Sequence, residues 1–212
     1  DAMHMNYSKR EMAKDMVQMM SKFGFKKFFV AGHDRGGRVA HRMARDHRSK
    51  IIAMSVLDIC PTLDMYEQTK NEFAKAYFHW FFLIQPKFLP ENMIKHDPRK
   101  WMKNCLDKWS GKHKFGNVEE AYLKSFKQFK RIHGSCEDYR ASATIDLEHD
   151  KKDRNKKLNI PIQVLWGKKG VIEKQFKPIK IWQKYSNKKV SGFAINSGHF
   201  IPEQNPKETI NK

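Results

Sequence analysis

The stretch "FFVAGHDRGGRVAHRMA", Phe28 to Ala44, decides the fold of this chain. A continuous apolar run predicts a buried strand, and an amphipathic helix is predicted after it. Between them lies a turn bounded by Gly32 and Gly36, with Asp34 at its centre. A glycine-bounded turn between strand and helix holds its central side chain in a strained, exposed position. The pattern therefore predicts a nucleophile at Asp34, where many hydrolases of this layout carry serine.

A second interpretation of Asp34 is a helix N-cap, a position that aspartate favours. The rest of the chain supports the nucleophile. A carboxylate nucleophile forms an ester, and a base must activate water to hydrolyse it. His199 in "NSGHFIPEQ" follows the last predicted strand, and Asp58 ends the strand after the elbow. Asp58 is the better acid to orient His199, because the "WGKKGVIE" loop offers Gly170 where many relatives of this layout keep an aspartate.

The strand and helix pattern predicts an α/β fold with parallel pairing and right-handed crossovers. Strands are expected at 26–31, 51–59, 162–167 and 190–196, and helices at about 37–46, at 176–185 and after Pro202. The part from Pro61 to about Thr144 is helical and aromatic, and it interrupts this pattern. We therefore expect a first core part at 1–60, a helical cap at 61–144 and a second core part at 145–212.

The segment before the elbow strand predicts an amphipathic helix. Ser8 and Glu11 have the spacing of a capping box, and Gly24 marks the end of the helix. Apolar side chains recur on one helical face, which predicts a core-facing stripe. Its members are Met12, Met16, Met19, Met20 and Phe23.

Composition limits the classes of function. The chain has 212 residues with 42 Lys and Arg against 23 Asp and Glu, a formal net charge of +19. The lysines are scattered, so we interpret them as a solvated surface that can gather small anions, and nucleic acid is not the expected partner. No apolar run is long enough to cross a membrane. The three cysteines have no zinc spacing, which favours free thiols in a reducing compartment, the cytoplasm.

Several motifs together resemble the haloacetate dehalogenases, including the fluoroacetate dehalogenases. They are "AGHDRGGRVAHRMA", "LDICPT", "YFHWFFLIQP", "PENMI", "CEDYRASATIDLEHD", "VLWGKKG" and "SGHFIPEQNP". The resemblance implies an α/β-hydrolase fold with a mostly parallel sheet and a helical cap. It implies hydrolysis of haloacetate to glycolate and halide through an aspartyl ester, with Asp34, Asp58 and His199 as catalytic residues. No metal or organic cofactor is expected, and a homodimer remains open.

Two arginines beside the nucleophile fit a substrate with its own carboxylate. Arg35 follows Asp34, and Arg38 lies three residues further on. Haloalkane dehalogenases and epoxide hydrolases typically have tryptophan after the nucleophile. Arginine binds carboxylates through two parallel hydrogen bonds, so we expect both side chains to hold the carboxylate of a 2-haloacid. The alternative is that either arginine pairs with a neighbouring acid of the protein.

The resemblance also implies a halide site in the cap. His79 and Trp80 in "YFHWFF" and Tyr139 in "CEDYRAS" match halide-binding positions of the family, and Trp109 matches a pocket wall. Each has an N–H or O–H to donate. Without the resemblance, "YFHWFF" reads as a buried aromatic stripe of a cap helix.

The chain also departs from the family. Family members have four further strands before the region that matches Tyr7, with a His-Gly loop that contributes to the oxyanion hole and the substrate pocket. We therefore expect a sheet that lacks its first strands, which puts activity in question. Two alternatives stay open. One is another hydrolase with an aspartate nucleophile, for example on epoxides, for which Tyr66, Tyr77, Tyr122 and Tyr139 are candidate donors. The other is an inactive fragment or a basic binding domain.

Overall fold

The computed structural model describes residues 3–111 and 113–211, so residues 1, 2 and 212 of the predicted core parts and residue 112 of the predicted cap lie outside it. Its sheet is parallel, in the order β1-β2-β3-β4. The strands are β1 (Phe28–His33), β2 (Ile51–Leu57), β3 (Ile162–Gly167) and β4 (Ser191–Ile195). The predicted parallel α/β architecture is confirmed, and the elbow strand ends two residues later than expected, next to Asp34.

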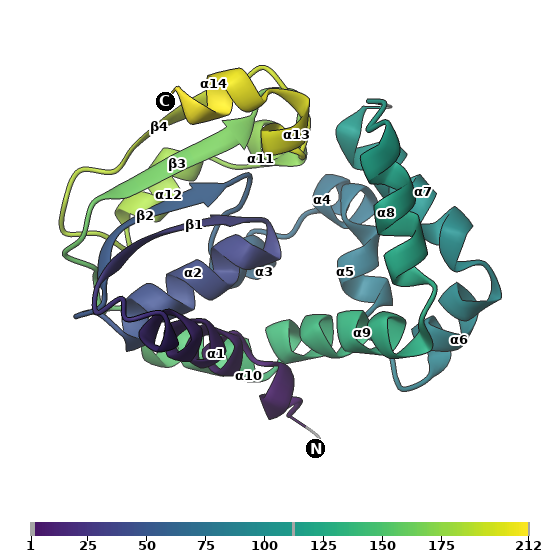
Figure 1. Cartoon of the computed structure of the whole chain (residues 1–212), viewed down its shortest axis with the longest axis horizontal. Coiled ribbons are helices and arrows are strands. Elements are labelled where there is room, and N and C mark those ends of the chain that lie inside the picture. The colour runs from purple at the N-terminus through teal and green to yellow at the C-terminus, as the bar shows by residue number, and fades with distance from the viewer. Residues whose placement is uncertain (1–2, 112, 212) are drawn as a thin grey trace.

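Helices surround the sheet and form a second layer beside it (Figure 1). The elements before and between the strands are η1 (Met5–Tyr7), α1 (Lys9–Lys22), α2 (Arg35–Asp46), α3 (Thr62–Glu67), α10 (Ile145–Lys152), α11 (Val171–Gln175) and α12 (Pro178–Gln183). The chain ends with α13 (Ile201–Gln204) and α14 (Pro206–Ile210). The second layer contains α4 (Asn71–Ala76), α5 (Phe78–Phe82), α6 (Leu89–His96), α7 (Pro98–Ser110), α8 (Asn117–Phe126) and α9 (Phe129–Ala143). The arrowheads of the strands point toward this layer, so the carboxyl ends of the strands face it.

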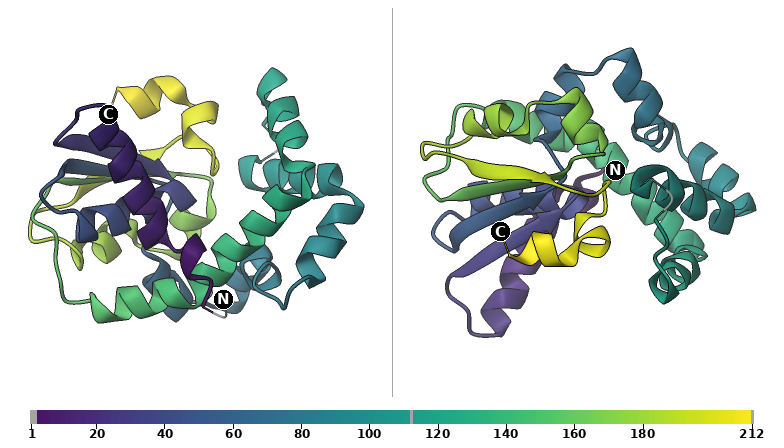
Figure 2. Two further views of the ribbon diagram at one scale, coloured as in Figure 1. Left: turned by 60° about the horizontal axis from the view of Figure 1, so that its bottom comes forward. Right: turned by 90° about the horizontal axis from the view of Figure 1, so that it is seen from above.

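Both faces of the sheet carry buried clusters, whereas Phe29 of β1 and Ile52 of β2 are 73% and 41% exposed. Neighbouring residues of a strand point to opposite faces. Val56 and Val164 belong to the larger core cluster on the face of α2 and α12, whereas Leu57 and Leu165 form a smaller cluster with Ile201 of α13. Figure 2 shows α12 and α14 on opposite sides of the sheet. This double cover explains why the strands read as continuous apolar runs.

Both ends of α1 lie where the sequence predicts them. The Ser8 hydroxyl accepts a hydrogen bond from the Glu11 amide at 3.3 Å, which confirms the predicted cap. Gly24 follows the helix with φ of +82°, a conformation that glycine adopts without steric cost.

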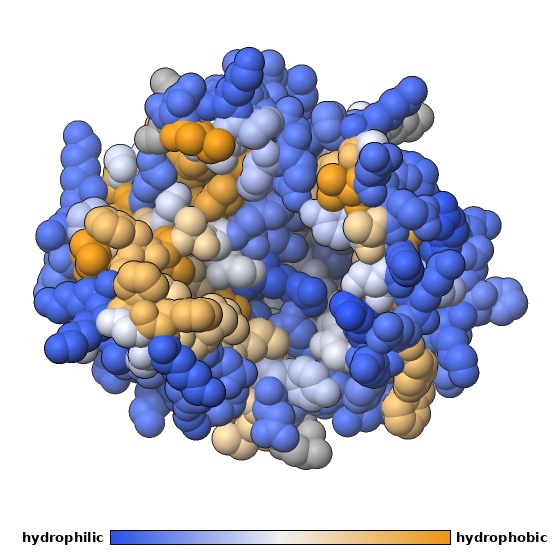
Figure 3. Space-filling view, viewed as in Figure 1, coloured by the Kyte–Doolittle hydropathy of each residue, from blue (hydrophilic) through white to orange (hydrophobic). Residues whose placement is uncertain are grey.

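The prediction that the methionine stripe of α1 is core is wrong for Met16, Met19 and Phe23, whereas Met20 is partly buried and packs against the core. Ala13 and Val17 are buried, while Met16, Met19 and Phe23 are 42%, 44% and 68% exposed. The helix packs against α2, and small side chains allow the two helix backbones to approach closely. The larger methionines lie on the adjacent face, and an apolar area over α1 and the edge strand β1 is visible in Figure 3.

The turn between β1 and α2 depends on close backbone contact. A Cβ atom on Gly32 would lie 2.4 Å from the carbonyl oxygen of Gly36. A Cβ on Gly37 would lie 2.7 Å from the Ile59 side chain. Only glycine lets the start of α2 pack this closely onto the strand. These contacts fix the position of the elbow.

The cysteines Cys60, Cys105 and Cys136 are buried and free. Burial raises the pKa of each thiol, to about 12 for Cys105 and Cys136. Within residues 3–111 and 113–211, no helix is both long and apolar enough to span a bilayer.

We expect Gly32→Ala to destabilise the chain by about 1–3 kcal/mol, because the added methyl overlaps the Gly36 carbonyl. Gly36→Ala is the matched control, since a Cβ there meets nothing within 4 Å and alanine favours helix. Urea unfolding of both variants measures the difference. Equal midpoints would mean that the close approach does not constrain the turn.

Candidate active site

Asp34 lies at the tip of the elbow, in a conformation that non-glycine residues rarely adopt. Its φ and ψ are +50° and −119°. Its side chain makes no capping hydrogen bond to α2, so the N-cap interpretation is wrong. Its amide donates to the Leu57 carbonyl at 3.1 Å, which ties the tip to β2. The carboxylate is therefore free of the helix end and available to react.

Asp58 and His199 form a line with Asp34. Asp58 follows β2 and is fully buried; its Oδ2 lies 2.7 Å from Nδ1 of His199. Its Oδ1 accepts a hydrogen bond from the Gly167 amide at 2.8 Å. On the other side of the imidazole, Nε2 lies 3.6 Å from Oδ2 of Asp34. Loops that follow three different strands thus bring an aspartate pair together around one histidine.

The charges of this line are strongly coupled. Burial lowers the pKa of His199, but the hydrogen bonds and charges of Asp34 and Asp58 outweigh it and raise the pKa. Burial raises the pKa of Asp34, whereas the hydrogen bond and charge of His199, followed by the charge of Arg38, lower it well below its usual range. At neutral pH the free site thus holds an imidazolium between two carboxylates.

His33 is a site neighbour that sequence reasoning missed. Its Nε2 donates to the His199 carbonyl at 2.8 Å, and the two rings are 4.7 Å apart. Burial, followed by the charge of His199, lowers the pKa of His33. It stands directly before Asp34 in "AGHD", and that position beside the nucleophile was the available signal. It fixes the backbone of the loop that carries His199.

The two arginines have different environments. Arg35 forms an ion pair with Asp138 of α9 at 2.5 Å. For Arg35, the alternative prediction of an acidic partner within the protein is therefore the one that the structure shows. Arg38 donates to the Thr62 hydroxyl at 2.6 Å and lies 4.4 Å from the Trp80 ring centre. In the described ranges no carboxylate lies within ion-pair distance of Arg38. Arg38 thus keeps a buried charge without a carboxylate partner, but it lines a small cavity behind the site and not the cavity that contains Asp34, which Arg35 lines.

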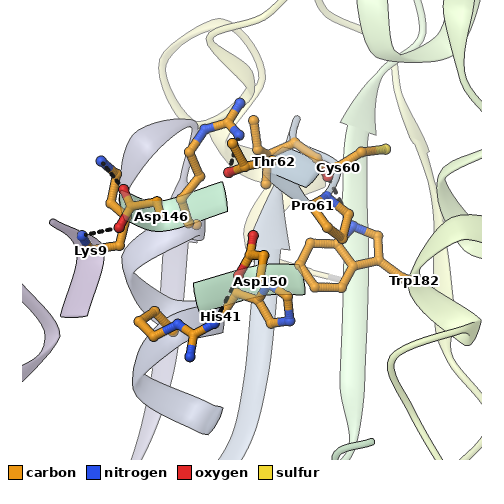
Figure 4. Close-up of a pocket in the computed structure, with 12 residues that line it drawn as sticks. Lys9, His41, Cys60, Pro61, Thr62, Asp146, Asp150 and Trp182 are labelled. Carbon is orange, nitrogen blue, oxygen red and sulfur yellow. Dashed lines mark hydrogen bonds and ion pairs between the residues drawn. The ribbon is translucent and has the colours of Figure 1, made fainter. Parts of the chain in front are cut away.

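Charged side chains lie behind Arg38, around a small cavity between α2, α3, α10 and α12 (Figure 4). The Lys9 amide donates to Asp146 at 2.9 Å, and Lys9 also pairs with Asp138. Asp150 accepts a hydrogen bond from Arg42 at 2.8 Å. These buried pairs join α1 and α2 to the helices that return from the cap. They anchor the helix that carries both site arginines.

A cavity of about 540 Å³ opens above Asp34, between the core and the cap. Figure 3 shows a recess there. Four residues predicted for the site line it together with Asp34: Arg35, His79, Trp109 and Tyr139. Trp80 is buried beneath Arg38 and does not line the cavity. The structure therefore brings cap residues of three helices, α5, α7 and α9, close to Asp34.

Polar atoms in this cavity lack partners. Nδ1 of His79 and Nε1 of Trp109 are buried, and neither has a hydrogen-bond partner among the described residues. Burial lowers the pKa of His79 to about 3, so the ring is neutral. Burial, followed by the charge of Asp34, raises the pKa of Tyr139, so its hydroxyl keeps its proton. Nε1 of Trp109 is always a donor, and Nδ1 of the neutral His79 ring is a donor in the tautomer that carries its proton there. A buried donor without a partner is costly and suits a bound anion.

A group with metal-ligand spacing lies elsewhere in the cap, at Glu91, His133 and Glu137. Arg140 donates to both glutamates, at 2.6 and 2.8 Å, and so already balances their charge. Neither glutamate lines the Asp34 cavity.

The sequence matches the family described as alpha/beta hydrolase fold over residues 2–206. It is 39% identical over 210 residues to a fluoroacetate dehalogenase from Burkholderia sp, covering 97% of this chain and 68% of that protein. A solved structure from Nostoc sp PCC 7120, described as an alpha/beta hydrolase, is 47% identical with a TM-score of 0.97, covering 100% of this chain and 73% of the other. A structure from Pseudomonas aeruginosa described as an epoxide hydrolase is 35% identical with a TM-score of 0.91, covering 97% and 70%. This chain thus spans about 70% of the length of these relatives.

We expect Asp34→Asn to lower the pKa of His199, because the variant removes the charge that stabilises the imidazolium. NMR titration of the imidazole nitrogens measures this pKa. Asp15→Asn on the exposed face of α1 removes the same charge at a remote position and is the control. An unchanged pKa of His199 in Asp34→Asn would contradict the coupling.

Proposed function

Because this chain belongs to the alpha/beta hydrolase fold family, we propose that it is a hydrolase that removes the halogen from a 2-haloacid, with haloacetate as the simplest substrate. The observation that carries the proposal is the alignment of Asp34, His199 and Asp58 below a cavity lined by Trp109, whose indole N–H has no partner among the described residues. The Burkholderia relative is a fluoroacetate dehalogenase, which supports the same chemistry.

In the first proposed step, a carboxylate oxygen of Asp34 attacks the α-carbon of the substrate. The new carbon–oxygen bond forms as the carbon–halogen bond breaks, and the halide leaves with the bonding electrons. The product is an ester between Asp34 and the carboxymethyl group. The low pKa of Asp34 suits this role, because the residue is ionised and ready to attack at neutral pH.

The substrate carboxylate needs a cation, since Asp34 repels it. Arg38 has no carboxylate partner in the described part of the chain, so we propose that its charge attracts the substrate carboxylate, although its side chain lies behind the lining of the Asp34 cavity. Arg35 lines the cavity but is shared with Asp138, so it contributes a second, weaker donor in our proposal. Burial away from water makes such charge-assisted pairs strong.

The leaving halide needs hydrogen-bond donors in a water-poor pocket. His79, Trp109 and Tyr139 line the cavity and carry N–H or O–H groups. Trp80, expected beside them, stacks on Arg38 and would act on the halide only if its N–H reaches past that arginine. We therefore propose His79, Trp109 and Tyr139 as the main halide donors, with Trp80 in a supporting position.

The second step uses the coupling between His199 and Asp34. Esterification removes the charge of Asp34, so one of the two groups that raise the pKa of His199 disappears. The imidazole can then lose its proton and act as a base. It takes a proton from water, whose oxygen attacks the ester carbonyl of Asp34. The ester bond breaks as the glycolate oxygen takes the proton from His199, and glycolate leaves. The new carboxyl group of Asp34 loses the remaining water proton to solvent, and the Asp34 carboxylate is restored. None of these steps uses a metal or an organic cofactor.

Epoxide opening is the second candidate function, because the Pseudomonas aeruginosa relative is described as an epoxide hydrolase. That reaction requires donors for the epoxide oxygen. Of the four tyrosines considered, Tyr139 lines the Asp34 cavity, whereas Tyr66, Tyr77 and Tyr122 do not. Burial, followed by the charges of Asp58 and Asp34, raises the pKa of Tyr77, so this residue lies near the site without lining the Asp34 cavity. We therefore propose the 2-haloacid as the better substrate class.

Asp34→Asn should abolish halide release from haloacetate, because an amide is a poor nucleophile. His199→Asn should allow one displacement and then retain the ester, since water lacks its base. Free-halide measurement tests the first variant, and intact-protein mass spectrometry tests the second for a covalent adduct. Normal turnover by either variant would reject the proposed mechanism.

Arg38→Leu should reduce kcat/KM for haloacetate by a factor that corresponds to about 2–5 kcal/mol, because a buried charge-assisted pair is lost. Arg35→Leu should act in the same direction but less, since Arg35 is shared with Asp138. Haloacetamide is neutral and should be affected far less in the same variants. Arg48→Leu, in the exposed turn after α2, is the control. A parallel fall for both substrates would make the arginines structural.

A further inference from the structure

A second cavity, also of about 540 Å³, lies on the other side of Trp109 from the Asp34 cavity. Tyr77, Trp109 and His199 line its inner end. The Trp109 ring centre is 5.9 Å from that of His199 and 4.5 Å from that of His79. Trp109 lines both cavities, so one indole ring separates this second space from the halide donors.

The charge of the second cavity has a single sign. Three exposed lysines line it: Lys108 of α7, Lys169 of the loop after β3, and Lys174 of α11. None of the described residues that line it is an aspartate or a glutamate. By contrast, the Asp34 cavity mixes both signs, with Asp34 and Asp138 beside arginines.

The lysines stand on ordered backbone close to the catalytic line. The Lys169 amide donates to the Ser197 carbonyl at 3.0 Å, two residues before His199. Lys108 donates to the Lys75 carbonyl at 3.2 Å, which holds its charge over α4 and α5. Burial lowers the pKa of His79, the charge of Asp34 opposes this, and the charges of His199 and then Lys108 lower the pKa further. The positive charge of Lys108 therefore reaches His79 of the proposed halide site.

We propose that this cavity, the lysine vestibule of Lys108, Lys169 and Lys174, gathers small anions next to the catalytic line and supplies them to the Asp34 cavity past Trp109. The identity of the anion, a halogenated carboxylate, rests on the proposed function. Clefts lined by charge of one sign raise the local concentration of counter-ions. The effect weakens with salt, because the Debye length is about 10 Å at 0.1 M ionic strength. The binding of anions by these lysines would also account for part of the large net charge of +19.

The test compares two double charge reversals in the full chain. Lys169→Glu/Lys174→Glu changes the vestibule. Lys157→Glu/Lys189→Glu makes the same change in net charge, at exposed positions before the starts of β3 and β4. All four lysines are exposed, and none belongs to the proposed catalytic machinery, so folding should be preserved.

The first measurement does not depend on turnover. Iodide and acrylamide both quench tryptophan fluorescence, and subtracting the spectrum of Trp109→Phe isolates the Trp109 emission. In the vestibule variant, iodide quenching of Trp109 at low salt should fall about threefold or more relative to acrylamide. The control variant should stay near the wild type. Equal iodide quenching in the two double variants would overturn the vestibule, whatever their activity.

The second measurement is halide release from chloroacetate and chloroacetamide at low and high salt. The vestibule variant should raise KM for chloroacetate about threefold or more at low salt and have little effect on chloroacetamide. If the vestibule variant alone loses iodide quenching, and neither the wild type nor any variant releases halide, the vestibule is supported and the proposed function is rejected. Active proteins with equal chloroacetate KM in both double variants would overturn its role in substrate supply.

Discussion

The hydrogen bond between buried Asp58 and His199 is the interaction on which the arrangement of the site depends. Asp58 is fully buried, and its two oxygens are engaged by His199 and by the Gly167 amide. These contacts join the ends of β2 and β3 to the loop after β4. An unpaired buried carboxylate would be costly, so the three loops are stable mainly in the geometry that satisfies it. That geometry also presents Nε2 of His199 to Asp34.

The coupling has a consequence for the reaction cycle. The resting line holds two carboxylates around one imidazolium, and the proposed chemistry neutralises one of the carboxylates. His199 can therefore change from a proton-bearing group to a base without any movement of the chain. The trigger is the loss of one charge on Asp34, which the ester itself supplies.

Much of the fold and the catalytic line could be predicted from sequence because the relevant signals are local. Continuous apolar runs located the strands, and the residues following them had to meet at one edge of a parallel sheet. Contacts between distant segments had no such signal. Arg35 and Asp138 are 103 residues apart, and nothing near either one predicted the pair. The prediction that the methionine stripe of α1 is buried failed for a related reason. Periodicity identifies an apolar face of the helix, but packing against α2 determines which face is buried.

The burial of all three thiols makes the molecule well suited to site-specific labelling. Thiolates react with maleimides, and burial raises the pKa of Cys60, Cys105 and Cys136, so few of their thiolates form near neutral pH. A cysteine introduced on the surface would react well before the native ones. A single fluorophore or spin label could then report distances between the cap and the sheet, with every native cysteine left in place.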